Sequence, residues 1–220
     1  MLPGSKTTVA DLAWLRRRGL ADRICILAQG GTPVLCICGG FQMLGRKLRD
    51  TAGVDGSVGG APGLNLLPIN TAFNSHKRTA LVHVRVLTAG FLGDSGDLVF
   101  DAYEIHVGQT RREAGVRPFA QLSGYDSQRS RFDGAVSADG LVIGTYAHGL
   151  FADERMRNAL LTSLAQRSGR VFVPRDLPDD PYARISRWLR GSIDVADLLA
   201  SCGVTRDHSG SPLAPAEVPG

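Results

Sequence analysis

An apolar run that ends at a cysteine and two glycines constrains the fold of this chain more than any other segment. Residues 33–37, PVLCI, have the composition of a buried strand, and a helix-like pattern begins at Phe41. Between them, Cys38, Gly39 and Gly40 form a turn that lifts the cysteine side chain clear of the backbone, at a helix N-terminus that stabilises a thiolate. The segment therefore indicates an α/β fold with a cysteine nucleophile. The alternative is a buried cysteine at the end of a strand.

Composition and charge bound the class of protein. The 220 residues are 43% hydrophobic and 6% aromatic and include 27 glycines, which suits one large α/β domain with many tight turns. The net charge of +4 comes from arginines scattered along the chain, so we expect no nucleic-acid partner. There is no signal peptide, no apolar run of membrane-spanning length and no disulfide framework among the four cysteines. We therefore expect no membrane partner and a cytoplasmic location with reduced thiols, and the oligomeric state stays open.

Three regions are expected along the chain. Residues 1–173 alternate helical and extended patterns and form the main domain. Residues 174–202 contain two short amphipathic patterns and form a helical C-terminal segment. Residues 203–220 are rich in Ser, Gly and Pro and are expected to be disordered.

The first part of the main domain opens on a helix and not on a strand. The pattern predicts a helix from a cap at Thr7 or Thr8 to about Arg18, followed by residues 23–28, which fit a strand or a helix equally well. A second helix is expected over residues 41–49. Because no clear strand precedes the cysteine strand, we expect the sheet to lack its N-terminal strands.

The second part of the main domain is mostly extended. Residues 79–88 and 98–109 alternate as sheet strands. A turn signal at residues 137–140 predicts a hairpin. A helix is expected from Asp153 to about Gln166.

Two histidines are candidates to act with Cys38. His148 follows the buried-strand pattern of residues 141–146, so it lies, like Cys38, at the carboxyl end of a strand, where α/β sheets carry their sites. The two residues can therefore meet as a thiol–imidazole pair. His106 is the second candidate, and Glu104 shares its face of an extended segment. No further ligand is near them at a useful spacing, so no metal site is expected.

Several segments together resemble a known family. Residues 38–45 (CGGFQMLG), 102–110 (AYEIHVGQT) and 144–151 (GTYAHGLF) look like three motifs of the cobalamin-pathway glutamine amidotransferases. The opening residues 2–15 (LPGSKTTVADLAWL) narrow the resemblance to the cobyric acid synthases, and residues 193–199 (IDVADLL) are similar to the C-terminal helix of that family. The resemblance implies a flavodoxin-like class I glutamine amidotransferase domain, with an open, twisted, mostly parallel sheet.

The resemblance also implies roles for particular residues. Cys38 would attack the side-chain amide of glutamine, and His148 would transfer protons to the leaving ammonia and from water. The backbone N–H groups of Gly39 and Gly4 would hold the oxyanion, and Gln42 would help to bind the substrate glutamine.

For Glu104 and His106 we expect a polar role near the site, with a surface salt bridge as the alternative for Glu104. Position 150, two residues after His148, is leucine where most related amidotransferases have a glutamate. The cobalamin branch generally lacks that glutamate, so the leucine agrees with the resemblance and leaves the group that orients His148 unassigned.

The resemblance assigns the second half of the reaction to another domain. The chain has no phosphate loop, so ATP and magnesium are expected only in a synthetase domain, and this chain would bind no cofactor. The ammonia would amidate side-chain carboxylates of a corrinoid acceptor, adenosylcobyrinic acid a,c-diamide. Two alternatives stay open: a related amidotransferase for another acceptor (formation of cobyrinic acid a,c-diamide, or a cell-wall lipid II precursor), and a truncated, non-catalytic remnant.

Overall fold

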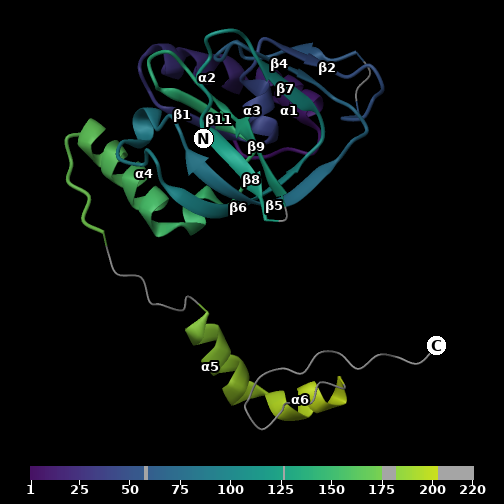
Figure 1. Cartoon of the computed structure of the whole chain (residues 1–220), viewed down its shortest axis with the longest axis vertical. Helices are drawn as coiled ribbons and strands as arrows, with labels where there is room; N and C mark the ends of the chain where they lie inside the picture. The colour runs from purple at the N-terminus through teal and green to yellow at the C-terminus, as the bar shows by residue number, and fades with distance from the viewer. Residues whose placement is uncertain (57–58, 126, 175–181, 203–220) are drawn as a thin grey trace. The chain divides into compact units, whose positions relative to one another are not determined.

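The computed structural model describes residues 1–56, 59–125, 127–174 and 182–202 (Figure 1). The chain divides into two compact units, residues 1–173 and residues 174–220. The expected disorder of residues 203–220 falls outside the described residues.

The first unit contains four α-helices, two 3₁₀-helices and eleven strands in the part that is described. The helices are α1 (Thr8–Arg17), α2 (Leu20–Gln29), α3 (Gly39–Met43), η1 (Gly90–Leu92), η2 (Leu150–Ala152) and α4 (Glu154–Arg167). The strands are β1 (Val34–Ile37), β2 (Lys47–Arg49), β3 (Ala61–Pro62), β4 (Ile69–Ala72), β5 (Arg78–Val86), β6 (Val99–His106), β7 (Gln109–Arg112), β8 (Ala120–Gly124), β9 (Ser127–Asp133), β10 (Ala135–Val136) and β11 (Val142–Thr145).

A small central sheet holds the two strands that carry the predicted site. Its order is β1-β11-β10, with β1 parallel to β11 and β10 antiparallel to β11. The opposite edge of β1 pairs with Leu2, whose N–H donates to the Leu35 carbonyl and whose carbonyl accepts from the Ile37 N–H, both at 3.0 Å. The parallel register aligns Ile37 with Thr145, so both strands end at the same edge.

The central sheet is buried on both faces. On β1, Val34 and Cys36 enter one hydrophobic cluster and Leu35 enters the other. On β11, Val142 and Ile143 divide in the same way. In a strand that is covered on both faces, apolar and polar residues do not alternate. This explains why its sequence is a continuous apolar run.

Two further layers cover the central sheet (Figure 1). One contains the mixed sheet β3-β2-β4-β7, with α1, α2 and α3 beside it. The other contains the antiparallel sheet β6-β5-β8-β9, with α4 next to β6. The predicted α/β fold is confirmed. The expected sheet is mostly parallel, but among the described residues parallel pairing is confined to β1 with β11, β2 with β4 and the Leu2 bridge, and the remaining pairs are antiparallel.

The start of α1 differs from the expected threonine cap. Thr7 makes no side-chain cap. Instead the carboxylate of Asp55 accepts the N–H groups of Thr8 and Val9, at 2.9 and 2.7 Å. An acidic side chain from a distant loop thus satisfies two N–H groups that a helix leaves unpaired and complements its dipole.

The structure decides the conformation of one ambiguous segment and corrects the prediction for another. Residues 23–28, which fitted a strand or a helix, lie within α2. The helix expected over 41–49 ends at Met43, and residues 47–49 form β2 with only Leu48 buried. Gly45 lies between the end of α3 and the start of β2. A Cβ there would lie 2.7 Å from the carbonyl oxygen of Ile69, so the chain passes too close to β4 at this point for a helix to continue.

Other predicted elements are confirmed. β10 and β11 form the hairpin around residues 137–140, and α4 begins after Asp153. The Asp153 side chain accepts the N–H groups of Arg155 and Met156, which is the capping that its position indicates. In the second unit, α5 (Ala183–Ser192) and α6 (Val195–Ser201) are the two expected helices, and Asp194 caps α6.

Contact between α3 and β11 generates a prediction for stability. A Cβ at Gly144 would lie 2.1 Å from Cδ2 of Phe41, a ring that is almost fully buried. We expect Gly144→Ala to lower the free energy of unfolding by about 1–3 kcal/mol, because the ring cannot move without disturbing the core. The urea midpoint measures this change.

Gly96→Ala is the matched control, since its Cβ would meet no atom within 4 Å. It should leave the midpoint close to that of the wild type. Equal midpoints for the two variants would show that Phe41 is not packed against β11 in this way.

Candidate functional site

The backbone at Cys38 adopts a conformation that non-glycine residues rarely take. Its φ is 54° and its ψ is −113°. Its N–H donates to the Thr145 carbonyl of β11 at 2.9 Å, and its carbonyl accepts from the Gln42 N–H of α3 at 3.0 Å. Such backbone strain persists only where the surroundings over-determine it, and it is concentrated at functional sites.

The two glycines after Cys38 are required by the N-terminal segment that crosses over them. A Cβ at Gly39 would lie 2.7 Å from the Ser5 nitrogen, and a Cβ at Gly40 would lie 2.5 Å from the Leu2 carbonyl oxygen. The Gly40 N–H donates to the Pro3 carbonyl at 3.1 Å, which ties the crossing segment to the start of α3. Close backbone approach therefore explains both glycines.

Cys38 and His148 face one cavity of about 530 Å³ at the carboxyl ends of β1 and β11. Gly4 is next to both of them, because a Cβ there would be 3.5 Å from both Cys38 Cβ and His148 Cε1. Gln42 and His106 line the same cavity. The structure thus brings together five of the residues expected at the site, including the pair more than a hundred positions apart in the sequence.

The thiol of Cys38 is nearly buried. Its Sγ lies 3.4 Å from the Ile105 carbonyl oxygen, to which it donates. Burial raises the pKa of this thiol, and the N–H of Gly39, which faces the sulfur, offsets that only in part. A thiol whose pKa is raised is protonated at neutral pH, so Cys38 would need a base in order to act as a nucleophile.

Cys36, two residues earlier, is a core residue. It is fully buried on the side of β1 that faces α3, and burial raises the pKa of its thiol to about 12. Of these two neighbouring cysteines, only Cys38 lines the cavity.

His148 has the properties of that base. Its backbone N–H and carbonyl pair with Tyr103 at 2.8 and 3.3 Å, and the two rings stack with centroids 5.0 Å apart. Its Nε2 is buried and has no hydrogen-bond partner among the described residues. Burial lowers the pKa of the imidazole, His106 lowers it further, and Glu104 opposes both. The ring is therefore neutral at neutral pH and can accept a proton.

The group that orients His148 is Tyr103 and not a carboxylate two residues further along the chain. Leu150 occupies that position and is buried in the core. Stacking and two backbone hydrogen bonds therefore fix the position of His148.

Gln42 has its side chain occupied within the protein. Its Nε2 donates to the Val107 carbonyl at 2.9 Å and to the Tyr146 hydroxyl at 3.1 Å, and its Oε1 accepts from the Thr8 hydroxyl at 3.0 Å. Both amide hydrogens are used, so the side chain shapes the cavity wall and retains one acceptor lone pair for a ligand.

Glu104 is a buried ion-pair centre and not a surface salt-bridge partner. It is fully buried, and its Oε2 accepts from Arg131 and, at 2.9 Å, from Arg78 Nε. Its Oε1 faces His106 Nε2 at 3.6 Å. Burial alone would raise the pKa of this carboxyl, but His106 and the two arginines outweigh it and the pKa is lowered.

His106 connects this ion-pair centre to the cavity. Its ring stacks on Tyr146 with centroids 3.8 Å apart, and its Nδ1 lies 3.2 Å from the Gly108 carbonyl oxygen. The polar role expected for Glu104 and His106 therefore takes the form of a network of charged side chains. Two of its members, His106 and Glu104, also shift the pKa of His148.

Sequence reasoning missed charged residues that line the cavity. Lys6, Lys77 and Asp55 line it, and the carboxylate of Asp55 also caps α1. The lysines could have been noticed, because they are two of only three in the chain. Asp55 could not, since its role depends on where a distant loop folds. Within the described ranges, no group of three or more His, Cys, Asp or Glu side chains could hold a metal ion.

Comparisons with known proteins agree on one family. The model of the CobB/CobQ-like glutamine amidotransferase domain matches residues 1–156. The chain is 44% identical over 94% of its length to a cobyric acid synthase of Klebsiella pneumoniae subsp. pneumoniae, and 37% identical over 94% of its length to one of Sorangium cellulosum. It covers 41% and 43% of those proteins.

The chain therefore spans about two fifths of the length of these relatives. Among solved structures, a glutamine amidotransferase is similar with a TM-score of 0.48 and 17% identity, over 73% of this chain and 76% of that chain.

The buried position of Glu104 generates a prediction for stability and its pH dependence. We expect Glu104→Gln to lower the free energy of unfolding by about 2 kcal/mol, less than for a fully buried pair because both arginines retain solvent contact. Because the native pKa of Glu104 is below its ordinary 4.5, its contribution is present above that value and is lost as the pH falls through the native pKa. The gap in urea midpoint between wild type and variant should therefore be widest above pH 4.5 and narrow as the pH falls below that value.

Glu113→Gln is the control, because Glu113 pairs with Arg46 at the surface. Its effect should stay within about 0.5 kcal/mol. A similar small effect of Glu104→Gln at neutral pH would contradict the buried ion-pair assignment.

Proposed function

The chain belongs to the CobB/CobQ-like glutamine amidotransferases, and on that basis we propose that it hydrolyses glutamine to supply ammonia in a cobyric acid synthase. The observation that supports this best is the geometry around Gly4, where the thiol of Cys38 and the neutral imidazole of His148 both lie close to one small residue in one cavity. A thiol with an unpaired base and nearby backbone donors is suited to acyl transfer.

The first half of the reaction forms a thioester. His148 Nε2 accepts the thiol proton as Cys38 Sγ attacks the side-chain carbonyl carbon of glutamine. The oxyanion that develops is held by the Gly39 N–H, which faces the sulfur, and by the Gly4 N–H, which makes no hydrogen bond within the described residues. His148 then returns its proton to the amide nitrogen, the carbon–nitrogen bond breaks and ammonia leaves.

The second half of the reaction restores the thiol. Neutral His148 takes a proton from water, and the hydroxide attacks the thioester carbonyl. The carbon–sulfur bond breaks, Cys38 regains the proton and glutamate leaves. The lowered pKa of His148 suits both halves, because each begins with a neutral imidazole.

The lysines of the cavity are suited to hold the other end of the substrate. Glutamine carries an α-carboxylate, and Lys6 and Lys77 present the ammonium groups that such a carboxylate needs. Gln42, which Val107, Thr8 and Tyr146 fix in place, forms part of the wall and offers its remaining lone pair to the α-ammonium group.

The ammonia would be used by a synthetase part of a longer protein. That part would bind ATP and magnesium and activate the side-chain carboxylates of a corrinoid, adenosylcobyrinic acid a,c-diamide. The identity to cobyric acid synthases over 94% of this chain supports that acceptor over the related ones. The four cysteines are all free thiols, which is consistent with a reducing compartment such as the cytoplasm.

No helix of the described residues is long and apolar enough to cross a membrane.

Covalent labelling with a glutamine analogue tests the proposed chemistry. We expect 6-diazo-5-oxonorleucine to label Cys38 stoichiometrically in the folded chain, as mass spectrometry of the digested protein would show. Cys38→Ala should abolish labelling. His148→Ala should slow it by about 10²–10⁴-fold, because the variant lacks the base that we propose for the thiol proton. Labelling should also slow as the pH falls below the ordinary histidine value of 6.5, since the protonated imidazole cannot act as base.

Cys202→Ser is the control variant, because Cys202 is exposed and lies in the second unit. It should leave both labelling and its pH profile unchanged. Absence of label on a folded wild-type chain, with a synthetase domain supplied, would overturn the proposal and favour a non-catalytic remnant.

A further inference from the structure

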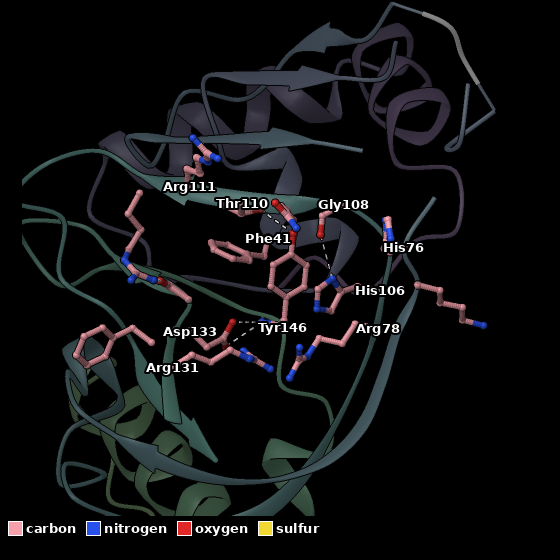
Figure 2. A pocket seen from close by; sticks show the side chains of 15 residues that line it. Phe41, His76, Arg78, His106, Gly108, Thr110, Arg111, Arg131, Asp133 and Tyr146 are labelled. Atoms are coloured by element: carbon pink, nitrogen blue, oxygen red, sulfur yellow. Dashed lines mark hydrogen bonds between the residues drawn. The ribbon is translucent and has the colours of Figure 1, made fainter. Parts of the chain in front are cut away.

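A second cavity of about 480 Å³ adjoins the first (Figure 2). His106 and Lys77 line both cavities, and the ring of His106 stacks on Tyr146, which lines the second. Apart from Tyr146, which helps to fix Gln42, the proposed glutaminase chemistry uses no other residue of its lining. What distinguishes this second cavity is charge, because its lining includes five cationic side chains: Lys77, Arg78, Arg111, Arg112 and Arg131.

Two of the arginines share a single counter-ion. Arg78 and Arg131 both donate to Oε2 of Glu104, which lies fully buried behind them. Figure 2 shows the two side chains turned toward each other below His106 and Tyr146. One carboxylate oxygen leaves most of the guanidinium N–H groups of the pair unused, so the pair has donors and positive charge left over for a second anion.

The remaining cations are also short of counter-ions. Arg112 donates to the Gly134 carbonyl at 2.9 Å, which positions its guanidinium but does not neutralise it. Arg111 and Lys77 form no ion pair with any described residue.

Asp133 is the one acidic residue among those that line this cavity, and it does not balance the charge. Its carboxylate is turned to the protein, where it accepts the Thr145 hydroxyl and, at 3.1 Å, the Tyr146 N–H. Burial raises its pKa, which reduces its negative charge further.

We propose that this second cavity binds a small anion that carries two or more carboxylate or phosphate groups. Planar guanidinium groups match both kinds of oxyanion, and three of the arginines are already held in place by hydrogen bonds to the protein. Little side-chain freedom would therefore be lost when an anion binds. The ring of His106 lies between the two cavities, so the occupant would sit one side chain away from the glutamine site.

Isothermal titration of the folded chain tests this site with two probes, tricarballylate and pyrophosphate. The first carries three carboxylates and the second carries two phosphate groups, so the two probes tell the sources of the charge apart. The titration contains no glutamine and measures no activity, so its result is independent of the proposed amidotransferase function. We expect at least one probe to bind with a stoichiometry of about one and to weaken as salt is raised.

Arg112→Glu is the test variant, since Arg112 donates to the Gly134 carbonyl on the cavity lining and makes no contact with Glu104. It should weaken binding at least tenfold. Arg112→Gln should weaken it less, and this milder variant keeps the test valid if the charge reversal fails to fold.

Arg23→Glu is the matched control. Arg23 is exposed on α2 and is not part of the cavity lining, so the variant changes the net charge equally but should bind the probe like the wild type. Binding of tricarballylate alone would identify a carboxylate site, binding of pyrophosphate alone a phosphate site, and binding of both a general oxyanion site. Binding of neither probe, or equal weakening by the Arg112 and Arg23 variants, would overturn the proposal.

Discussion

The strained backbone of Cys38 is the constraint on which the rest of the site depends. A residue with a side chain keeps a φ of 54° only because β11 and α3 hold its N–H and carbonyl on either side. The segment around Leu2 and Pro3 crosses over the turn that follows Cys38, and it can come this close only because two glycines form that turn. The parallel pairing of β1 with β11 then brings His148 to the same edge, so one piece of backbone geometry brings together the proposed nucleophile, base and oxyanion donors.

Burial decides how this pair works. The central sheet is covered on both faces, and the same desolvation raises the pKa of the Cys38 thiol and lowers that of the His148 imidazole. Both shifts favour a neutral pair at rest, and in the mechanism that we propose the proton moves from Cys38 to His148 only when glutamine is bound. Glu104 alone would favour a protonated His148, but its charge is already shared among His106, Arg78 and Arg131. Burial and His106 outweigh Glu104 in setting the pKa of His148, and the sharing of Glu104 between two arginines leaves positive charge facing the second cavity.

The sequence predicted what local patterns and parallel pairing determine. The strand, turn and helix around Cys38, the strand end at His148 and the cap at Asp153 all depend on neighbouring residues, and they could be found without the structure. The cap of α1 by Asp55 could not be found, because it joins residues 47 positions apart. Likewise, only the pairing of β5 with β6 brings Arg78 to Glu104 and makes a buried centre of what the sequence allowed as a surface salt bridge.

The central claim is that Cys38 forms a covalent intermediate with glutamine itself, and trapping that intermediate tests the claim most directly. Acid quench of the folded chain within seconds of mixing with L-glutamine, followed by digestion and mass spectrometry, would locate a γ-glutamyl thioester. The expected result is an adduct on the peptide that contains Cys38, sensitive to hydroxylamine, with Cys25 and Cys202 unmodified. A folded chain that releases ammonia from glutamine without any adduct at Cys38, or with the adduct on another cysteine, would contradict the account.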